Sequence, residues 1–223
     1  MKVIITGTTG MVGEGVLHVA LNHPKITEVL IVNRKSIGKT HPKLKEIIHA
    51  DFFCLDPIAE KFSGYDATLF CLGVSSVGMN EEKYFQLTHT LTMHFASAVL
   101  RYSPNSTFSY ISGVGTDSSE KGRSMWARVK GKTENDLMTL TSAVPPFKAV
   151  YCFRPGYLHP IPGMKHTHPY YKYIGWMYPF FKAVLSKYTT TLEELALAMI
   201  NISLYGYDKK IIEVKDILLL SKK

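Results

Sequence analysis

The first thirteen residues constrain the fold more than any other part of the chain. A short apolar run, Lys2–Thr6, leads directly into TGTTGMVGEG, in which Gly7, Gly10 and Gly13 have the spacing G-x-x-G-x-x-G. An apolar pattern with helical spacing follows over Met11–Asn22. A strand, a glycine-rich turn and a helix in immediate succession form the opening unit of an open α/β sheet.

Strand and helix patterns alternate along almost the whole chain, which is typical of a parallel sheet with helices on both faces. We predict one Rossmann-type, doubly wound α/β domain spanning residues 1–223, in which residues 157–190 form a small C-terminal substrate lobe rich in proline and aromatic residues. The expected strands are Lys2–Thr6, Glu28–Asn33, Ile47–Phe52, Ala67–Gly73, Ser106–Ser112, Phe147–Gly156 and an edge strand Lys210–Val214; the expected longer helices are Met11–Asn22, Glu81–Arg101, Arg123–Leu140 and a last one capped by Thr191.

Composition excludes several classes of protein. No apolar run approaches the roughly 18–20 residues that cross a bilayer, so no membrane span is expected. The N-terminal sequence reaches its glycine-rich loop too early for a signal peptide, and a cytoplasmic location follows by default. The net charge is +8, but the basic residues are scattered and no stacking motif accompanies them, so we expect no nucleic-acid partner.

Neither a disulfide framework nor a metal site is expected. The three cysteines, Cys54, Cys71 and Cys152, have no paired spacing and lie in apolar surroundings, which predicts buried thiols in a reducing compartment. Histidines gather between positions 159 and 168, but no carboxylate or cysteine joins them with a spacing that would fix ligand geometry.

The glycine spacing between a strand and a helix indicates a dinucleotide-binding loop. The backbone must approach a pyrophosphate closely there, and the start of the helix offers unpaired N–H groups and a positive dipole. In NAD sites a carboxylate at the end of the second strand holds the ribose hydroxyls, whereas this chain has Asn33, Arg34 and Lys35. A guanidinium can bind a ribose phosphate with two hydrogen bonds, so NADP(H) is favoured over NAD(H). A solvated basic loop is the alternative.

Several further motifs appear in one order along the chain: TGTTGMVGEGVL, VNRKS, ADF, FCLGVSS, YISGVG, WARVKGKTENDL and FRPG. In this combination the chain resembles the short-chain dehydrogenase/reductase superfamily. The resemblance is to its atypical branch, the NAD(P)-binding proteins similar to Tat-interacting protein and to the NAD-dependent epimerases and dehydratases. It covers nearly the whole sequence, and it implies a Rossmann fold.

The resemblance also implies a set of contacts with the dinucleotide. Asp51 and Phe52 would flank the adenine, with the carboxylate of Asp51 accepting a hydrogen bond from the adenine amino group; a surface turn is the alternative for Asp51. The complete implied set is Gly7, Thr9, Gly10, Met11, Val12 and Gly13 at the phosphates, Arg34 and Lys35 at the ribose phosphate, Asp51 and Phe52 at the adenine, Leu72 and Gly73 beside the ribose, and Lys130, Arg154, Pro155 and Gly156 near the nicotinamide.

The expected catalytic group departs from the pattern of the superfamily. There a tyrosine transfers the substrate proton, a lysine four residues later lowers its pKa and holds the ribose, and a serine or threonine polarises the substrate carbonyl. Here Trp126 replaces the tyrosine, and an indole does not cycle a proton at accessible pH. Lys130 and Ser112 are the expected catalytic residues, although Gly113 could be the position that matches the reactive hydroxyl.

The sequence leaves two functions open. The first is an NADP(H)-dependent oxidoreductase acting on a small apolar carbonyl, quinone or flavin-like substrate. The second is a catalytically silent protein that senses NADP(H) and changes its contacts with a protein partner, as a monomer or a weak dimer. Residues that could replace the missing hydroxyl or proton donor are Thr116, Ser118, Ser119, Tyr84, His89, His94, Tyr157 and His159.

Overall fold

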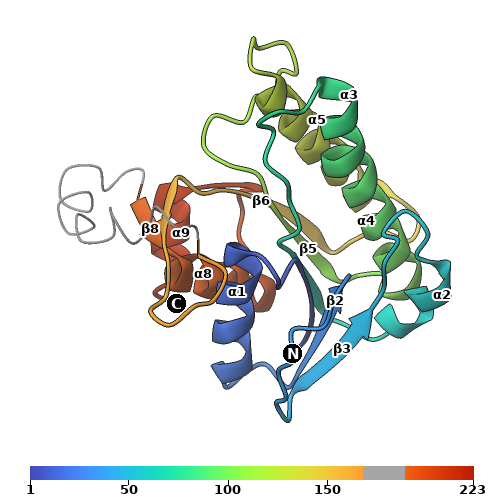
Figure 1. Cartoon of the computed structure of the whole chain (residues 1–223), viewed down its shortest axis with the longest axis vertical. Helices are drawn as coiled ribbons and strands as arrows, with labels where there is room; N and C mark the ends of the chain where they lie inside the picture. The colour runs from blue at the N-terminus through green and yellow to red at the C-terminus, as the bar shows by residue number, and fades with distance from the viewer. Residues whose placement is uncertain (168–188) are drawn as a thin grey trace.

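A computed structural model describes residues 1–167 and 189–223 of the chain. The described residues form a seven-stranded, wholly parallel sheet with the order β3-β2-β1-β4-β5-β6-β9 (Figure 1). The strand order reverses between β1 and β4, and ligands of such sheets bind outside the carboxyl ends of the strands at that point. The strands are β1 (Lys2–Thr6), β2 (Glu28–Asn33), β3 (Leu44–Ile48), β4 (Ala67–Phe70), β5 (Thr107–Ile111), β6 (Ala149–Arg154) and β9 (Ile211–Glu213).

Helices cover both faces of this sheet, as predicted. In Figure 1, α1, α8 and α9 lie together on one side, while α3, α4 and α5 lie on the other. The bounds are α1 Met11–Asn22, α2 Asp56–Ala59, α3 Glu81–Phe85, α4 Leu91–Tyr102, α5 Met125–Thr139, α8 Leu192–Tyr205 and α9 Val214–Leu220, with a π-helical turn Gln86–Thr90 joining α3 to α4 and 3-10 turns at Glu60–Phe62 and Leu140–Ser142.

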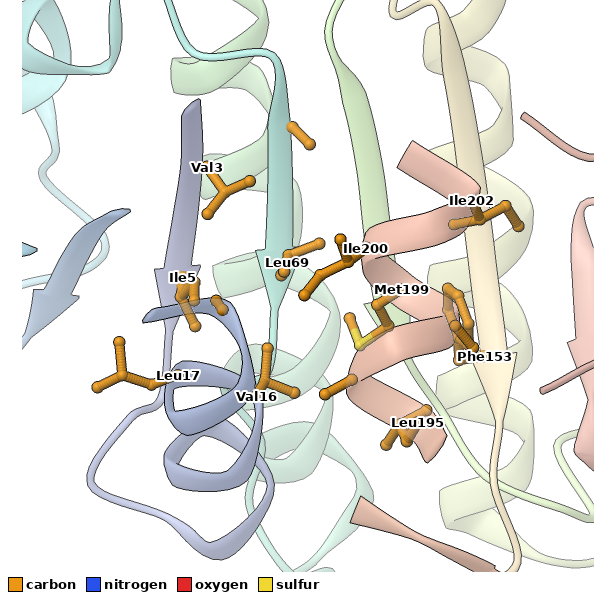
Figure 2. Close-up of a cluster of buried hydrophobic side chains, with 14 of the residues drawn as sticks. Val3, Ile5, Val16, Leu17, Leu69, Phe153, Leu195, Met199, Ile200 and Ile202 are labelled. Atoms are coloured by element: carbon orange, nitrogen blue, oxygen red, sulfur yellow. The ribbon is translucent and has the colours of Figure 1, made fainter. Parts of the chain in front are cut away.

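Each strand sends alternate side chains into two separate cores. Val3 and Ile5 of β1 pack toward α1 and α8, whereas Ile4 between them packs toward the aromatic core beneath α4. Figure 2 shows the first core, in which Val16 of α1 and Met199 of α8 approach the same strands. Because both faces of the sheet are buried, the strand sequences are continuously apolar and do not alternate between apolar and polar residues.

The last long helix begins where the sequence predicts. The Thr191 side chain accepts a hydrogen bond from the Glu194 backbone N–H at 3.0 Å, and the Glu194 carboxylate accepts one from the Thr191 N–H at 2.7 Å. These two bonds form a capping box. Just before it, β8 (Thr189–Thr191) pairs in parallel with β7 (Tyr157–His159), outside the main sheet. Most of the predicted substrate lobe, residues 168–188, lies outside the described residues.

The predictions from the sequence were wrong in several details. The third strand is Leu44–Ile48, not Ile47–Phe52, because its register pairs Ile48 with Asn33, the last residue of β2, and no partner strand continues beyond that point. Cys54 was expected to be buried, but it lies in the exposed turn after this strand. The short helices α2 and α9 were not predicted. No helix within the described ranges is both long enough and apolar enough to cross a membrane.

Candidate functional site

A cleft of about 760 Å³ lies at the carboxyl ends of the central strands, where the strand order reverses. A cavity of this size suits a cofactor or a drug-sized ligand. Ten of the residues expected to bind cofactor or substrate line it. The described lining consists of Thr9, Gly10, Met11, Val12, Cys71, Leu72, Gly73, Val74, Ser75, Ile111, Ser112, Lys130, Pro155, Gly156, Leu158, His166 and Thr167.

The glycine-rich loop at one wall of the cleft requires its glycines. Gly7 has φ +69°, and a Cβ there would lie 2.7 Å from the Cys71 carbonyl oxygen. A Cβ at Gly13 would overlap the carbonyl oxygen of Gly7. These two residues therefore shape the loop from behind, while Gly10 lies at the cleft itself.

Helix α1 points its amino end at the cleft. Its N-cap is Gly10, which has no side chain to accept a hydrogen bond from the first turn. The first N–H groups of an α-helix lack intrahelical partners and carry a partial positive charge, so they favour an anion such as a pyrophosphate. The loop and the helix end thus fit the phosphates of a dinucleotide.

The end of β2 is tied to the glycine-rich loop by a buried pair of side chains. Asn33 Nδ2 donates to Thr8 Oγ1 at 2.7 Å, and the same two side chains share a second contact of 3.0 Å through Asn33 Oδ1. Asn33 is 3% exposed and Thr8 is 1% exposed. Asn33 occupies the place where an NAD site has its carboxylate, but its amide is used to hold the loop.

Arg34 and Lys35 follow Asn33 and are both exposed. Neither makes an ion pair or a side-chain hydrogen bond within residues 1–167 and 189–223. The next turn is held separately, because the Glu46 carboxylate accepts hydrogen bonds from Ser36 Oγ at 2.5 Å and from the Ile37 N–H at 3.0 Å. The two cations therefore remain available to a phosphate beside an ordered turn.

Lys130 brings a positive charge from α5 to the opposite wall of the cleft. Its Nζ donates to the Ser112 carbonyl oxygen at 2.6 Å and lies 3.5 Å from that of Ile111, at the end of β5. Burial lowers the pKa of Lys130 to about 8, and the charge of Glu134 only partly opposes this shift. Helix α5 approaches this closely because residue 131 is glycine: a Cβ there would overlap the Asp117 carbonyl oxygen.

The Ser112 hydroxyl is directed away from the expected catalytic role. It donates to the buried carboxylate of Glu134, and its oxygen lies 3.1 Å from the Phe153 carbonyl oxygen. Glu134 is 0% exposed and also pairs with the guanidinium of Arg154 through both oxygens. The pKa of Arg154 is raised, chiefly by its hydrogen bonds with Glu134. Ser112, Glu134 and Arg154 thus form one network behind the cleft wall.

The residue in the place of the expected tyrosine packs elsewhere. A Cβ at Gly115 would lie 3.5 Å from Cη2 of Trp126, so the indole covers the loop after β5. Trp126 is absent from the described lining of the cleft. The hydroxyls that could have replaced Ser112 are occupied as well: Thr116 donates to the Gly113 carbonyl oxygen at 2.8 Å, and Ser118 accepts from Arg154 at 2.5 Å.

The expected adenine residues lie beyond the cleft, in the turn after β3. Asp51 is exposed, and its Oδ1 accepts from the Phe53 N–H at 2.8 Å. Phe52 is 3% exposed and stacks on Phe95 in the core, so its ring is not accessible to a ligand. Phe53 is 43% exposed and meets the ring of His94 edge-on. The exposed aromatic ring of this turn is therefore that of Phe53.

The segment after β7 folds back over the amino end of α1. The Glu14 carboxylate accepts hydrogen bonds from the backbone N–H groups of Lys165 at 2.9 Å and His166 at 2.8 Å, and it lies 2.9 Å from His166 Nδ1. Burial raises the pKa of Glu14, but these hydrogen bonds outweigh burial and the net shift is downward. His166 and Thr167 line the cleft beyond this contact.

Sequence reasoning missed four residues that organise the site: Glu14, Asn33, Glu134 and His166. Glu134 alone could have been found from the sequence, because it follows Lys130 by four residues and therefore shares its face of α5. The others are joined to partners 25 and 152 residues away, and no local pattern reports such contacts.

Comparisons with known proteins agree with this geometry. Residues 2–111 match the family model described as the NAD-binding domain of semialdehyde dehydrogenase. A dTDP-glucose 4,6-dehydratase from Streptomyces venezuelae, solved with NAD bound, is similar in structure with a TM-score of 0.71 and 13% identity, over 96% of this chain and 75% of that one. A short-chain dehydrogenase/reductase from Saccharomyces cerevisiae matches with a TM-score of 0.65 and 13% identity, over 93% and 92% of the two chains.

A UDP-N-acetylglucosamine 4-epimerase from Methanobrevibacter ruminantium also matches, with a TM-score of 0.67 and 17% identity over 95% of this chain and 75% of that one. Identities this low establish the fold rather than the reaction. The chain therefore has the Rossmann fold shared by these dehydrogenases, dehydratases and epimerases, and its residues 2–111 match an NAD-binding domain of the semialdehyde dehydrogenase type.

Proposed function

We propose that the chain is an atypical short-chain dehydrogenase/reductase that binds NADP(H) in preference to NAD(H) and reduces a small apolar acceptor, which is a carbonyl, a quinone or a flavin-like compound. The observation that carries the proposal is the make-up of one cleft. The amino end of α1 and the ammonium of Lys130 face it, its other walls are largely apolar, and its described lining contains no carboxylate. Such a site favours a bound anion over water.

The preference for the 2′-phosphate rests on Arg34 and Lys35. Both are exposed at the end of β2, and Asn33 brings no negative charge to that position. A carboxylate there would repel a ribose phosphate, whereas a guanidinium can bind it with two hydrogen bonds. In this proposal Lys130 lies at the nicotinamide end of the cofactor, and Leu158, His166 and Thr167 line the cleft on the side toward the acceptor.

Calorimetric titration of the cofactor-stripped protein with NADPH and NADH tests the proposal. We expect NADPH to bind about 10- to 100-fold more tightly than NADH, which corresponds to about 1.4–2.8 kcal/mol. Arg34→Ala should remove most of that preference and leave NADH affinity nearly unchanged. Arg101→Ala, a change at an exposed arginine paired with Asp56, is the matched control for lost positive charge. Equal, weak affinity for both nucleotides would refute the proposal.

A second candidate function is an NADP(H) sensor without turnover. Two observations favour it: the Ser112 hydroxyl is held by Glu134, and Trp126 packs on the loop after β5 instead of joining the described lining of the cleft. NADPH consumption with a panel of carbonyls, quinones and flavins separates the two functions. A sensor would bind NADPH and leave every acceptor unreduced.

A further inference from the structure

We propose that Lys130 is the proton-transfer residue of this cleft and that the acceptor is therefore a carbonyl compound, with Lys130 Nζ donating the proton to the carbonyl oxygen. The inference rests on the proposed function, and it assigns to the lysine the role for which the resemblance expects a tyrosine. Lys130 lines the cleft beside Ser112, Pro155 and Gly156, at the ends of β5 and β6.

The ammonium of Lys130 is held by hydrogen bonds, but these bonds do not use all of its N–H donors. It has three N–H donors, and its hydrogen-bond partners among the described residues are two backbone carbonyls, those of Ser112 and Ile111. At least one N–H is therefore available to a ligand in the cleft. No carboxylate lies within ion-pair distance of Nζ in the part of the chain that the structure describes, so its proton is not held by a neighbouring acid.

Among the described residues, few charged groups surround Lys130. Glu134 comes from its own helix, but the carboxylate is committed to Ser112 and Arg154. Arg154 of β6 adds positive charge behind the wall, and the amino end of α1 and His166 face the cleft from the other side. Cys71 of β4 is also in the lining, and burial raises the pKa of its thiol, so it stays neutral.

Burial and the charge of Glu134 act on the pKa of Lys130 in opposite directions. Burial is the largest influence and lowers the pKa of Lys130 to about 8, within reach of the pH at which a general acid is most effective. An exposed lysine, with a pKa near ~10.4, would release its proton far too rarely for that role. The site therefore places a proton donor of suitable acidity where the indole of Trp126 provides none.

The other polar groups of the lining are less suited. The Ser112 hydroxyl is buried and directed to Glu134. His166 is exposed at the rim, where its Nδ1 faces the Glu14 carboxylate. Within the described lining, Lys130 alone is both anchored on the sheet and chemically able to exchange a proton at neutral pH.

The proton step balances with the hydride that a reduced dinucleotide supplies when bound. As the carbonyl carbon gains hydride, the carbonyl oxygen gains negative charge. One N–H bond of Lys130 breaks, an O–H bond forms, and the product is an alcohol. Nζ is left as a neutral amine, which takes a proton from water before the next turnover.

The first test measures Lys130 in the cofactor-free protein. Incorporation of ¹³C-labelled lysine leaves every N–H group unchanged, and NMR follows the Cε signal of each lysine with pH. We expect one signal to titrate near pH 8 and to disappear in Lys130→Arg. In Glu134→Gln the same signal should titrate at lower pH, because a negative charge that favours the ammonium has been removed. A Lys130 signal that titrates at the value of the exposed lysines would overturn the inference.

The second test uses the pH dependence of carbonyl reduction by NADPH. We expect kcat to be constant below about pH 8 and to fall tenfold per pH unit above it, with the break shifted downward in Glu134→Gln. Lys130→Arg and Lys130→Met should lower kcat about 100-fold or more, since general acid catalysis contributes about 10²–10⁴. Lys132→Arg is the matched control: this lysine lies on the same helix, pairs with Asp136 and is outside the cleft.

Three results would contradict the inference: full activity in Lys130→Arg, a pH break that follows His166→Gln instead of Lys130, and reduction of quinones or flavins but of no carbonyl. Calorimetry with NADPH on the same variants distinguishes this failure from failure of the proposed function. Retained, selective NADPH binding leaves the proposed function standing, and loss of binding in the unmodified protein removes both.

Discussion

The network behind the cleft wall gives the sharpest test of how this site is held together. Glu134→Leu removes a carboxylate that is 0% exposed and leaves its main partner, the Arg154 guanidinium, with a side chain only 13% exposed. The remaining partners are weaker substitutes: the Ser118 hydroxyl at 2.5 Å and the carboxylate of Glu213 at 3.6 Å. Removing one partner of a buried pair costs about 3–5 kcal/mol, because the other charge stays buried without compensation.

Equilibrium unfolding in urea, followed by far-UV circular dichroism, measures this cost. With an m-value of about 2–3 kcal/mol/M, a loss of about 4 kcal/mol lowers the midpoint by about 1.3–2 M. Arg154→Met should cost a similar amount, because Glu134 is then the unpaired charge. The double variant should lose far less than the sum, since replacing a buried pair with apolar residues is often neutral.

The control is a pair on the surface. Arg101 and Asp56 are joined at 3.3 Å, but their side chains are 64% and 83% exposed, so Arg101→Ala should change the free energy of unfolding by less than about 1 kcal/mol. A buried pair is contradicted if Glu134→Leu is no more costly than this control, or if the costs of the two single changes at Glu134 and Arg154 simply add.

Three further results are expected. Gly131→Ala should lower the melting temperature by several degrees, since its Cβ would overlap the Asp117 carbonyl oxygen and overpacking costs about 1–3 kcal/mol. The backbone N–H of His166 should lose protection against hydrogen exchange, relative to the intrinsic rate at each pH, as the pH falls through the lowered pKa of Glu14, because a protonated carboxyl no longer binds it strongly. Thr191→Ala should cost about 1 kcal/mol in urea unfolding through loss of the capping box.

Each of these has a clear contrary outcome. Gly73→Ala is the steric control for Gly131, because a Cβ at Gly73 would have no atom within 4 Å, and equal melting temperatures of the two variants would contradict the first expectation. Exchange at His166 that persists unchanged in Glu14→Gln would show that the carboxylate does not hold the segment. An unchanged unfolding midpoint in Thr191→Ala would mean that the cap is dispensable.

The fold could be predicted from the sequence because each pattern that indicates a strand, a turn or a helix involves only neighbouring residues, and such patterns recur along the chain. The glycine spacing from Gly7 to Gly13, the apolar strands and the cap at Thr191 each report on a few neighbouring residues, and together they define the Rossmann arrangement that the structure has. The third strand was misplaced because its end is set by pairing with β2, up to Asn33, and not by its own composition.

The backbone positions of the site could be predicted from the sequence, but the directions of several side chains could not. The cleft contains Gly10, Leu72 and Gly156, whose positions follow from strand ends, and it contains Lys130, whose face of the helix follows from spacing. The direction of the Ser112 hydroxyl could not be foreseen, because it depends on Glu134, which reaches it from another element 22 residues further along the chain. Side-chain partners across elements are set by packing, and a single sequence does not display them.

The order in which the chain is made has a consequence for how this domain matures. Val3 and Ile5 belong to the first strand, yet the core that covers them is completed by Met199 and its neighbours on α8 (Figure 2). During synthesis a chain that has reached the end of β5 has this face of the sheet covered only by α1, because the residues of α8 come much later in the sequence. Such a nascent chain exposes apolar surface for seconds at normal elongation rates, which makes it a client for chaperones that bind unfolded chains.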